Sequence, residues 1–279
     1  MSLAVAVPCG LASALAYGVA TAVQHSAAHR STGDADVGGL VRLLRDPRWL
    51  MSIGGDAVGL VLQVIALATG PVVLVQPLLV LALPVSLPVS WALGGPRPAR
   101  NDYLACASII GGLALFFALI GDPGTGHPMT ARSAAIAAVT ALACGVVLCL
   151  AVRRTSPTVR ALTYGAVSGA WFGLVGVMLK GCADQWLAHG LSGFGQPEGL
   201  VPLVAVLVVG ASAITLLQIS FQVGALSASF PANKSADPLT AVVLGAILLG
   251  ERVPVGPGYL AAYLVCLVAI VLGAVQLAG

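Results

Sequence analysis

Charged residues are scarce in this sequence, since Asp, Glu, Lys and Arg together make up only 8% of its 279 residues. Soluble domains carry roughly 25% charged residues. Hydrophobic residues make up 58% of the chain, and the mean hydropathy is +1.00. The shortage of charge excludes an ordinary soluble domain and predicts an all-α polytopic membrane protein that lies in the lipid bilayer. The formal net charge of +3 says little about partners, and we expect no nucleic-acid partner.

Motifs for catalysis and nucleotide binding are also missing. The sequence has no HExxH, no nucleophile with a base at a recognisable spacing, and no GxxxxGKS or GxxxxGKT. We therefore expect no enzymatic activity, no direct coupling to ATP within this chain and no cofactor. The six cysteines are scattered over apolar segments without a CxxC pair, which favours small core residues over disulfides or metal ligands.

Long apolar stretches are what the sequence does contain, and about nine of them can cross a hydrocarbon core of about 30 Å. The first has no Lys or Arg before it, unlike a secretory signal, so we expect it to remain as a membrane span. A short amphipathic helix in the lipid interface is also expected at residues 39–47. The predicted spans lie near residues 3–23, 49–69, 72–93, 103–120, 131–152, 162–179, 200–223, 226–249 and 258–277.

The basic residues of the short loops predict the orientation. Most of them fall in the loops after the odd-numbered spans, and such an excess marks the cytoplasmic side. The N-terminus is therefore expected outside and the C-terminus inside. The preference for Arg over Lys and the Ala-rich composition indicate a bacterial source, hence a multi-pass protein of the cell (plasma) membrane.

An internal repeat relates the two parts of the chain. Leu93-Gly-Gly-Pro-Arg97 is followed by Tyr103, and Leu249-Gly-Glu-Arg-Val253 is followed by Tyr259 at the same spacing. If spans 1–4 and 6–9 are copies, the single span 5 between them gives the copies opposite orientations. The chain is then one integrated membrane domain with a first repeat at 1–125, a linking span at 126–155 and a second repeat at 156–279, an inverted architecture typical of alternating-access carriers.

The predicted span at 226–249 contains Asn233, Lys234 and Asp237. An ionised side chain at membrane depth normally faces a bundle interior or a wet cavity and finds a partner. Pro231 and Pro238 each remove a helical hydrogen bond, so we expect a broken helix beside the charges, a common form of transporter binding site. The alternative is a Lys234–Asp237 pair that only neutralises itself between packed helices.

Five further polar residues complete the candidate substrate site. Asp56 can serve as a cation or proton site, or can be a carboxyl that is protonated or hydrogen-bonded to a neighbouring helix. Four carboxamides can line a polar path or bond one helix to another; they are Gln63, Gln76, Gln218 and Gln222. If the solute is a metal cation, Asp56 and Asp237 are the candidate ligands.

Three residues outside this set receive structural interpretations. Lys180 is expected to extend its ammonium to the membrane interface. Glu251 and Arg252 are expected to form an exposed ion pair at the outer mouth. Trp171 is expected to pack between helices.

The sequence resembles the drug/metabolite transporter superfamily with its EamA-type repeats over nearly its whole length. The resemblance rests on residues 66–77, on residues 222–231 and on Leu248-Leu-Gly-Glu-Arg252. The nine spans, the outside N-terminus and Gly54-Gly-Asp-Ala57 look most like the NIPA-like magnesium transporter branch, in which a glutamate usually stands where Asp56 does. The resemblance implies a secondary-active transporter that moves a small solute, a metabolite or drug-like compound, by alternating access.

Three functions stay open at this point. An organic solute suits a pocket with a few polar groups among apolar ones, and Lys234 can pair with an anionic group. A magnesium or other divalent cation prefers oxygen ligands such as Asp56, Asp237 and the glutamines, although Lys234 repels a dication. A non-transporting accessory or scaffold protein would use the polar residues only to join helices, and a homodimer is also open.

Overall fold

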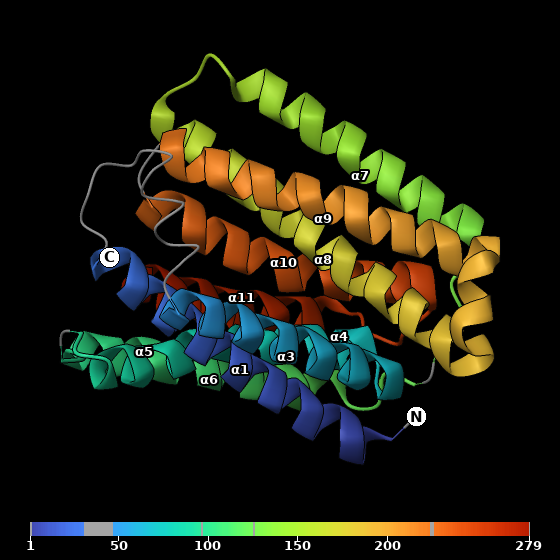
Figure 1. Ribbon diagram of the computed structural model, residues 1–279, viewed down its shortest axis with the longest axis horizontal. Coiled ribbons are helices and arrows are strands. Elements are labelled where there is room, and N and C mark those ends of the chain that lie inside the picture. The colour runs from blue at the N-terminus through green and yellow to red at the C-terminus, as the bar shows by residue number, and fades with distance from the viewer. Residues whose placement is uncertain (1, 31–46, 96, 125, 224–225, 279) are drawn as a thin grey trace.

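The computed structural model describes residues 2–30, 47–95, 97–124, 126–223 and 226–278, and for 24–30, 48–49, 226–228, 230–231 and 278 only the helical backbone. All regular structure in these ranges is helical (Figure 1). The predicted interfacial helix at 39–47 lies almost entirely outside the described residues. The elements are α1 (Leu3–Arg30), α3 (Pro47–Thr69), α4 (Val72–Leu78), η1 (Leu79–Leu81), α5 (Ala82–Ala92), α6 (Arg100–Ile120), α7 (Ala131–Val152), α8 (Pro157–His189), η2 (Gly190–Gly195), α9 (Pro197–Val223), α10 (Leu226–Leu249) and α11 (Pro257–Ala278).

Within the described residues, eight helical segments are long and apolar enough to cross a membrane. Each matches one of the predicted spans. The remaining predicted span corresponds to α10, a helix of 24 residues whose Asn233, Lys234 and Asp237 lower its hydropathy. The eight segments are Leu3–Val23, Leu50–Thr69, Val72–Ala92, Arg100–Ile120, Ala131–Val152, Pro157–Gly195, Pro197–Val223 and Pro257–Leu277.

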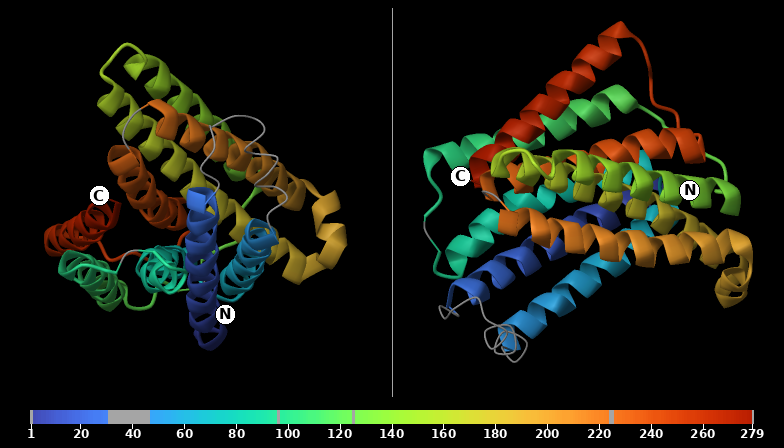
Figure 2. Two further views of the ribbon diagram at one scale, coloured as in Figure 1. Left: turned by 60° about the vertical axis from the view of Figure 1, so that its left-hand side comes forward. Right: turned by 90° about the horizontal axis from the view of Figure 1, so that it is seen from above.

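The helices form a single bundle whose long axes run roughly side by side (Figure 1). α1 packs against α3 and α5, α8 packs against α9 and α10, and α6 packs against α11. The start of α1 and the end of α11 lie at opposite ends of the bundle in both Figure 1 and Figure 2.

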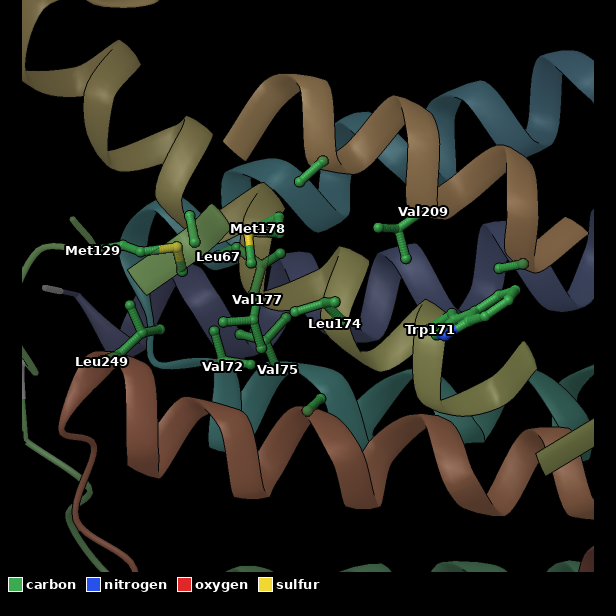
Figure 3. Close-up of a cluster of buried hydrophobic side chains, with 14 of the residues drawn as sticks. Leu67, Val72, Val75, Met129, Trp171, Leu174, Val177, Met178, Val209 and Leu249 are labelled. Atoms are coloured by element: carbon green, nitrogen blue, oxygen red, sulfur yellow. The ribbon is translucent and has the colours of Figure 1, made fainter. Parts of the chain in front are cut away.

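The centre of the largest apolar core is α8 (Figure 3). Leu174, Val177 and Met178 on this helix are fully buried and contact side chains of α3, α4, α7, α9 and α10. Trp171 is buried as well, and its Nε1 donates a hydrogen bond of 2.9 Å to the carbonyl of Ala141 on α7. Trp171 therefore packs between helices, as the sequence analysis expected.

A row of glycines on α8 brings it close to α10. A Cβ at Gly165, Gly169 or Gly173 would overlap the carbonyl oxygen of Ser229, Asn233 or Asp237, respectively. Both sets of residues recur every four positions and so lie on one face of their helix. Small residues at such spacing let helix backbones approach closely inside a membrane. This contact fixes where the polar residues of α10 stand relative to α8.

The expected break in the span at 226–249 is wrong. α10 is one continuous helix through Pro231 and Pro238, because its backbone is held along the glycine face of α8. The break occurs instead in the span at 72–92, which is divided into α4, a turn of 3-10 helix and α5. Pro84, in the first turn of α5, cannot donate to the carbonyl of Val80 in this 3-10 turn, and its ring crowds that carbonyl.

Candidate functional site

Asn233 and Ser168 form a buried polar connection between three helices. The side chain of Asn233 is 1% exposed, and its Nδ2 donates a hydrogen bond of 3.2 Å to Ser168 Oγ on α8. The Ser168 hydroxyl donates in turn to the carbonyl of Ala213 on α9, at 2.8 Å. Asn233 Oδ1 is buried and has no hydrogen-bond partner among the described residues, so this group can accept one more hydrogen bond.

Gln76 on the short helix α4 supplies a second unsatisfied polar group. Its side chain is 3% exposed, and its Nε2 is buried with no hydrogen-bond partner in the part of the chain that the structure describes. The amide lies so close to Gly176 of α8 that a Cβ there would overlap it. An unpaired donor buried in protein costs roughly 1–3 kcal/mol, so such groups call for a specific explanation.

Tyr17 connects α1 to the polar residues of α3 and α10. Its hydroxyl donates to Gln63 Oε1 at 2.9 Å, and the ring lies within electrostatic range of both Asp56 and Asp237. Asp56 and Asp237 are half-buried. The two carboxylates, which lie far apart in the sequence, are therefore both within electrostatic range of one side chain.

The other predicted site residues divide between this region and the protein surface. Lys234 is half-buried and lies within electrostatic range of Asp237. Gln218 and Gln222 have exposed side chains near the end of α9, unlike the buried Gln63 and Gln76. No group of three or more His, Cys, Asp or Glu side chains suited to a metal ion occurs among the described residues.

An apolar groove adjoins the polar residues of α10. Its volume is about 420 Å³, and it opens between α6, α10 and α11. Its lining includes Ser235 and Pro238 on α10, Pro77 on α4, and the neighbouring rings of Phe116 and Tyr263. Pro77 is the neighbour of Gln76, and Ser235 is the neighbour of Lys234, so apolar surface and polar groups meet along these helices.

A second polar region, at the end of the bundle near the start of α4, was not predicted. A cavity of about 210 Å³ there is lined by Lys180, Asp184, Glu251 and His127. We call these four residues the end cluster. Lys180 Nζ forms a salt bridge of 2.6 Å with Asp184, and the two side chains are 4% and 32% exposed.

Two sequence-based expectations are corrected by the end cluster. Lys180 does not extend to the interface, since it is buried and paired with a carboxylate one helical turn away. Glu251 is 3% exposed and accepts hydrogen bonds from the backbone N–H groups of Val72 and Val73, at 2.7 and 2.8 Å. Arg252 is exposed, so no exposed Glu251–Arg252 pair forms. Burial raises the pKa of Glu251 above its usual value, although the two hydrogen bonds and Lys180 oppose this.

The fold and these polar regions define a multi-pass membrane protein built of helices. The chain is 31% identical over 245 residues to an uncharacterized protein of Corynebacterium glutamicum, an alignment that covers 87% of this chain and 83% of the relative. It belongs to the same family as that protein. No family model matches the chain, and no solved structure matches it significantly.

Proposed function

We propose that this protein is a secondary-active transporter of the drug/metabolite transporter type, with EamA-type repeats, that moves a small solute by alternating access. Two of the five buried side-chain groups without a hydrogen-bond partner among the described residues carry the proposal, Gln76 Nε2 and Asn233 Oδ1. One is a donor and the other an acceptor, and they come from the two predicted repeats. A solute bound between the repeats would form hydrogen bonds with both groups in one conformation of the carrier and would separate from them in the other.

The architecture that we propose has nine spans, with α10 as the eighth. The first inverted repeat comprises α1, α3, α4–α5 and α6, the second comprises α8 to α11, and α7 links them. Two observations support this arrangement. The start of α1 and the end of α11 lie at opposite ends of the bundle, as an odd number of crossings requires. The packing of α1 against α3 and α5 also parallels the packing of α8 against α9 and α10.

An organic solute, a metabolite or drug-like compound, fits the chemistry of these residues. Ligand sites are mostly apolar with a few polar groups that fix orientation. The apolar groove at α6, α10 and α11 borders Ser235 and Pro77, while Asn233, Lys234 and Asp237 lie on the same helix as Ser235. An ammonium and a carboxylate three residues apart, nearly one helical turn, can pair with both ends of a zwitterion.

A NIPA-like transporter of magnesium or another divalent cation is the second candidate. It is favoured by Asp56 and Asp237, which both lie within electrostatic range of Tyr17, and by the side-chain oxygen Oε1 of Gln63, which is bonded to the Tyr17 hydroxyl. Magnesium is commonly held by one or two carboxylates and retains several waters. Asp56 and Asp237 would then be its direct ligands.

The test combines ligand binding with flux. Purified protein is screened for solutes that raise its thermal unfolding temperature, since a ligand at a hundred times its Kd stabilises by about 2.7 kcal/mol. Proteoliposomes with a trapped indicator report magnesium entry. Asp237→Asn should abolish the binding of an organic solute, and either Asp237→Asn or Asp56→Asn should abolish magnesium entry. Glu198 is an exposed acid in the first turn of α9, and Glu198→Gln should leave both responses intact.

Each outcome favours one function. A stabilising organic solute that also crosses the proteoliposome membrane supports the metabolite carrier. Saturable magnesium entry that is lost in either Asp variant supports the cation transporter. A folded wild-type protein that binds no solute and carries no flux identifies an accessory or scaffold protein instead.

A further inference from the structure

The end cluster lies where the two predicted repeats meet. The loop after α6 is joined by two backbone hydrogen bonds to the end of α10 and to the loop at 250–256 that follows it. The N–H of His127 donates to the carbonyl of Leu249 at 2.6 Å, and the N–H of Arg252 donates to the carbonyl of Pro123 at 2.8 Å. Gly250 has a φ of +65°, a conformation that suits glycine, and a Cβ there would also press on the His127 ring. This end of the bundle is therefore closed by contacts between the repeats.

Glu251 makes the most specific of these contacts. It belongs to the loop after α10, yet each of its carboxylate oxygens accepts one N–H from the first turn of α4, on the other repeat. α4 is a helix of seven residues and also carries Gln76, four positions after Val72. Releasing Glu251 would free the start of α4 and so affect the candidate solute site one turn away.

The charges of the end cluster do not balance. From α8, Lys180 and Asp184 neutralise each other in their salt bridge. From the loop at 121–130, His127 faces the same cavity, and Arg252 beside Glu251 is exposed. The residues of α4 carry no titratable side chain, and α10 contributes only Leu249 to the cavity. Among the described residues Glu251 is therefore a buried carboxylate without a salt bridge, since Lys180 lies within electrostatic range of it but is paired with Asp184.

We propose that Glu251 is a proton-binding site, and that a proton bound there holds this end of the protein closed. The inference rests on the proposed carrier function, for which it names the proton as the coupling ion. In the closed state Glu251 is buried, whereas in a state open at this end it would face water. Neutralising a buried carboxyl removes the cost of keeping a charge out of water. The closed state therefore binds the proton more tightly, and the proton in return favours the closed state.

The pKa of Glu251 agrees with this direction, because burial raises it above the ordinary value in the closed state. A group whose pKa is higher in the closed state than in the open one stabilises the closed state as the pH falls. Acid should therefore hold α4 in place, and alkaline pH should release it.

The test is hydrogen exchange of the backbone amides at the start of α4, followed by mass spectrometry on the full-length protein in lipid nanodiscs. Exchange rates are divided by the intrinsic rate at each pH. In the wild type we expect exchange at residues 72–75 to slow as the pH falls from about 8 to about 5, by about tenfold for each unit by which the pKa of Glu251 in the closed state exceeds that in the open state. Glu251→Gln, which mimics the protonated form, should exchange slowly at every pH, and Glu251→Ala should exchange rapidly at every pH.

Matched controls separate this proposal from a purely structural role. Glu198→Gln removes an exposed acid and should keep the wild-type pH dependence. Slow exchange at residues 174–178 in the core of α8 shows that a variant is folded. If Glu251→Ala does not fold, the comparison of the wild type with Glu251→Gln tests the proposal. The proposal is overturned if Glu251→Gln retains the pH dependence, if the wild type has none, or if added sodium at constant pH produces the slowing. The readout needs neither solute nor flux, so failure of the transport assays does not affect it.

Discussion

At the residue scale, buried polar side chains occur in two regions, the interior of the bundle and the end cluster. Ser168 and Asn233 join helices to one another inside the bundle. At the end of the bundle, Glu251 joins the loop after α10 to the backbone of α4, and Lys180 pairs with Asp184 on its own helix. In both places a partner offsets the cost of burying a polar group, so removing the partner leaves the other group buried and unpaired.

Replacing Ser168 by alanine should destabilise the protein by about 1 kcal/mol, because Asn233 Nδ2 loses its acceptor and the Ala213 carbonyl loses its donor. Interhelical hydrogen bonds in membranes average somewhat less than this. Thermal unfolding in one fixed detergent measures the change. Ser212→Ala is the matched control, since the Ser212 hydroxyl bonds only to the carbonyl of Val208 in its own helix. Equal effects of the two variants would contradict the interpretation.

Replacing Lys180 by methionine should destabilise the protein by about 2 kcal/mol, because it leaves Asp184 and Glu251 in one cavity without a lysine. The loss is smaller than the 3–5 kcal/mol of a fully buried pair, since the Asp184 side chain is 32% exposed. Adding Asp184→Asn to this variant should recover part of the loss. A double variant less stable than Lys180→Met alone would show that charge is not the cause.

At the scale of elements, glycine and proline decide how the helices meet. The glycines of α8 allow α10 to approach along a whole face, whereas the break after α4 places Gln76 and the N–H groups that bind Glu251 on one short segment. The candidate solute site and the end cluster are therefore connected through α4. A change at either one reaches the other through this helix.

Gly169→Ala should lower the unfolding temperature, because its Cβ would overlap the Asn233 carbonyl and push α10 away from α8. Gly111→Ala on α6 is the matched control, since a Cβ there meets no atom within 4 Å. Alanine favours helix by up to about 1 kcal/mol over glycine, so the control should be neutral or stabilising. The expectation fails if both variants behave alike.

At the scale of the whole molecule, the number of crossings decides the architecture. Eight crossings would place both termini on the same side of the membrane, whereas nine place them on opposite sides. The start of α1 and the end of α11 at opposite ends of the bundle favour nine. An inverted repeat also needs this odd number, because the linking helix α7 reverses the second copy.

A reporter that folds only in the cytoplasm, fused after residue 279, should be active, because the C-terminus is expected inside. An epitope before residue 1 should be accessible from outside intact spheroplasts. The basic loops after the odd-numbered spans predict this orientation. Finding both termini on one side would remove α10 from the membrane-crossing helices and with it the inverted repeat.

The sequence by itself determined the membrane class and the position of eight apolar spans, because hydropathy is a local property of about 20 consecutive residues. It also singled out Asn233 and Gln76 as polar residues inside the bundle. It misplaced the helix break, since a proline's effect depends on what holds the surrounding backbone, and α8 holds that of α10.

Only the tertiary structure decided which partners the buried charged side chains bind. Glu251 lies 179 positions from Val72 in the sequence, yet bonds to its backbone. Lys180 has its carboxylate partner four residues on, but nothing local indicates that both face a cavity closed by Glu251. A hydrogen bond or an ion pair depends on distances of about 3 Å, and such distances between remote segments are set by how the whole bundle packs.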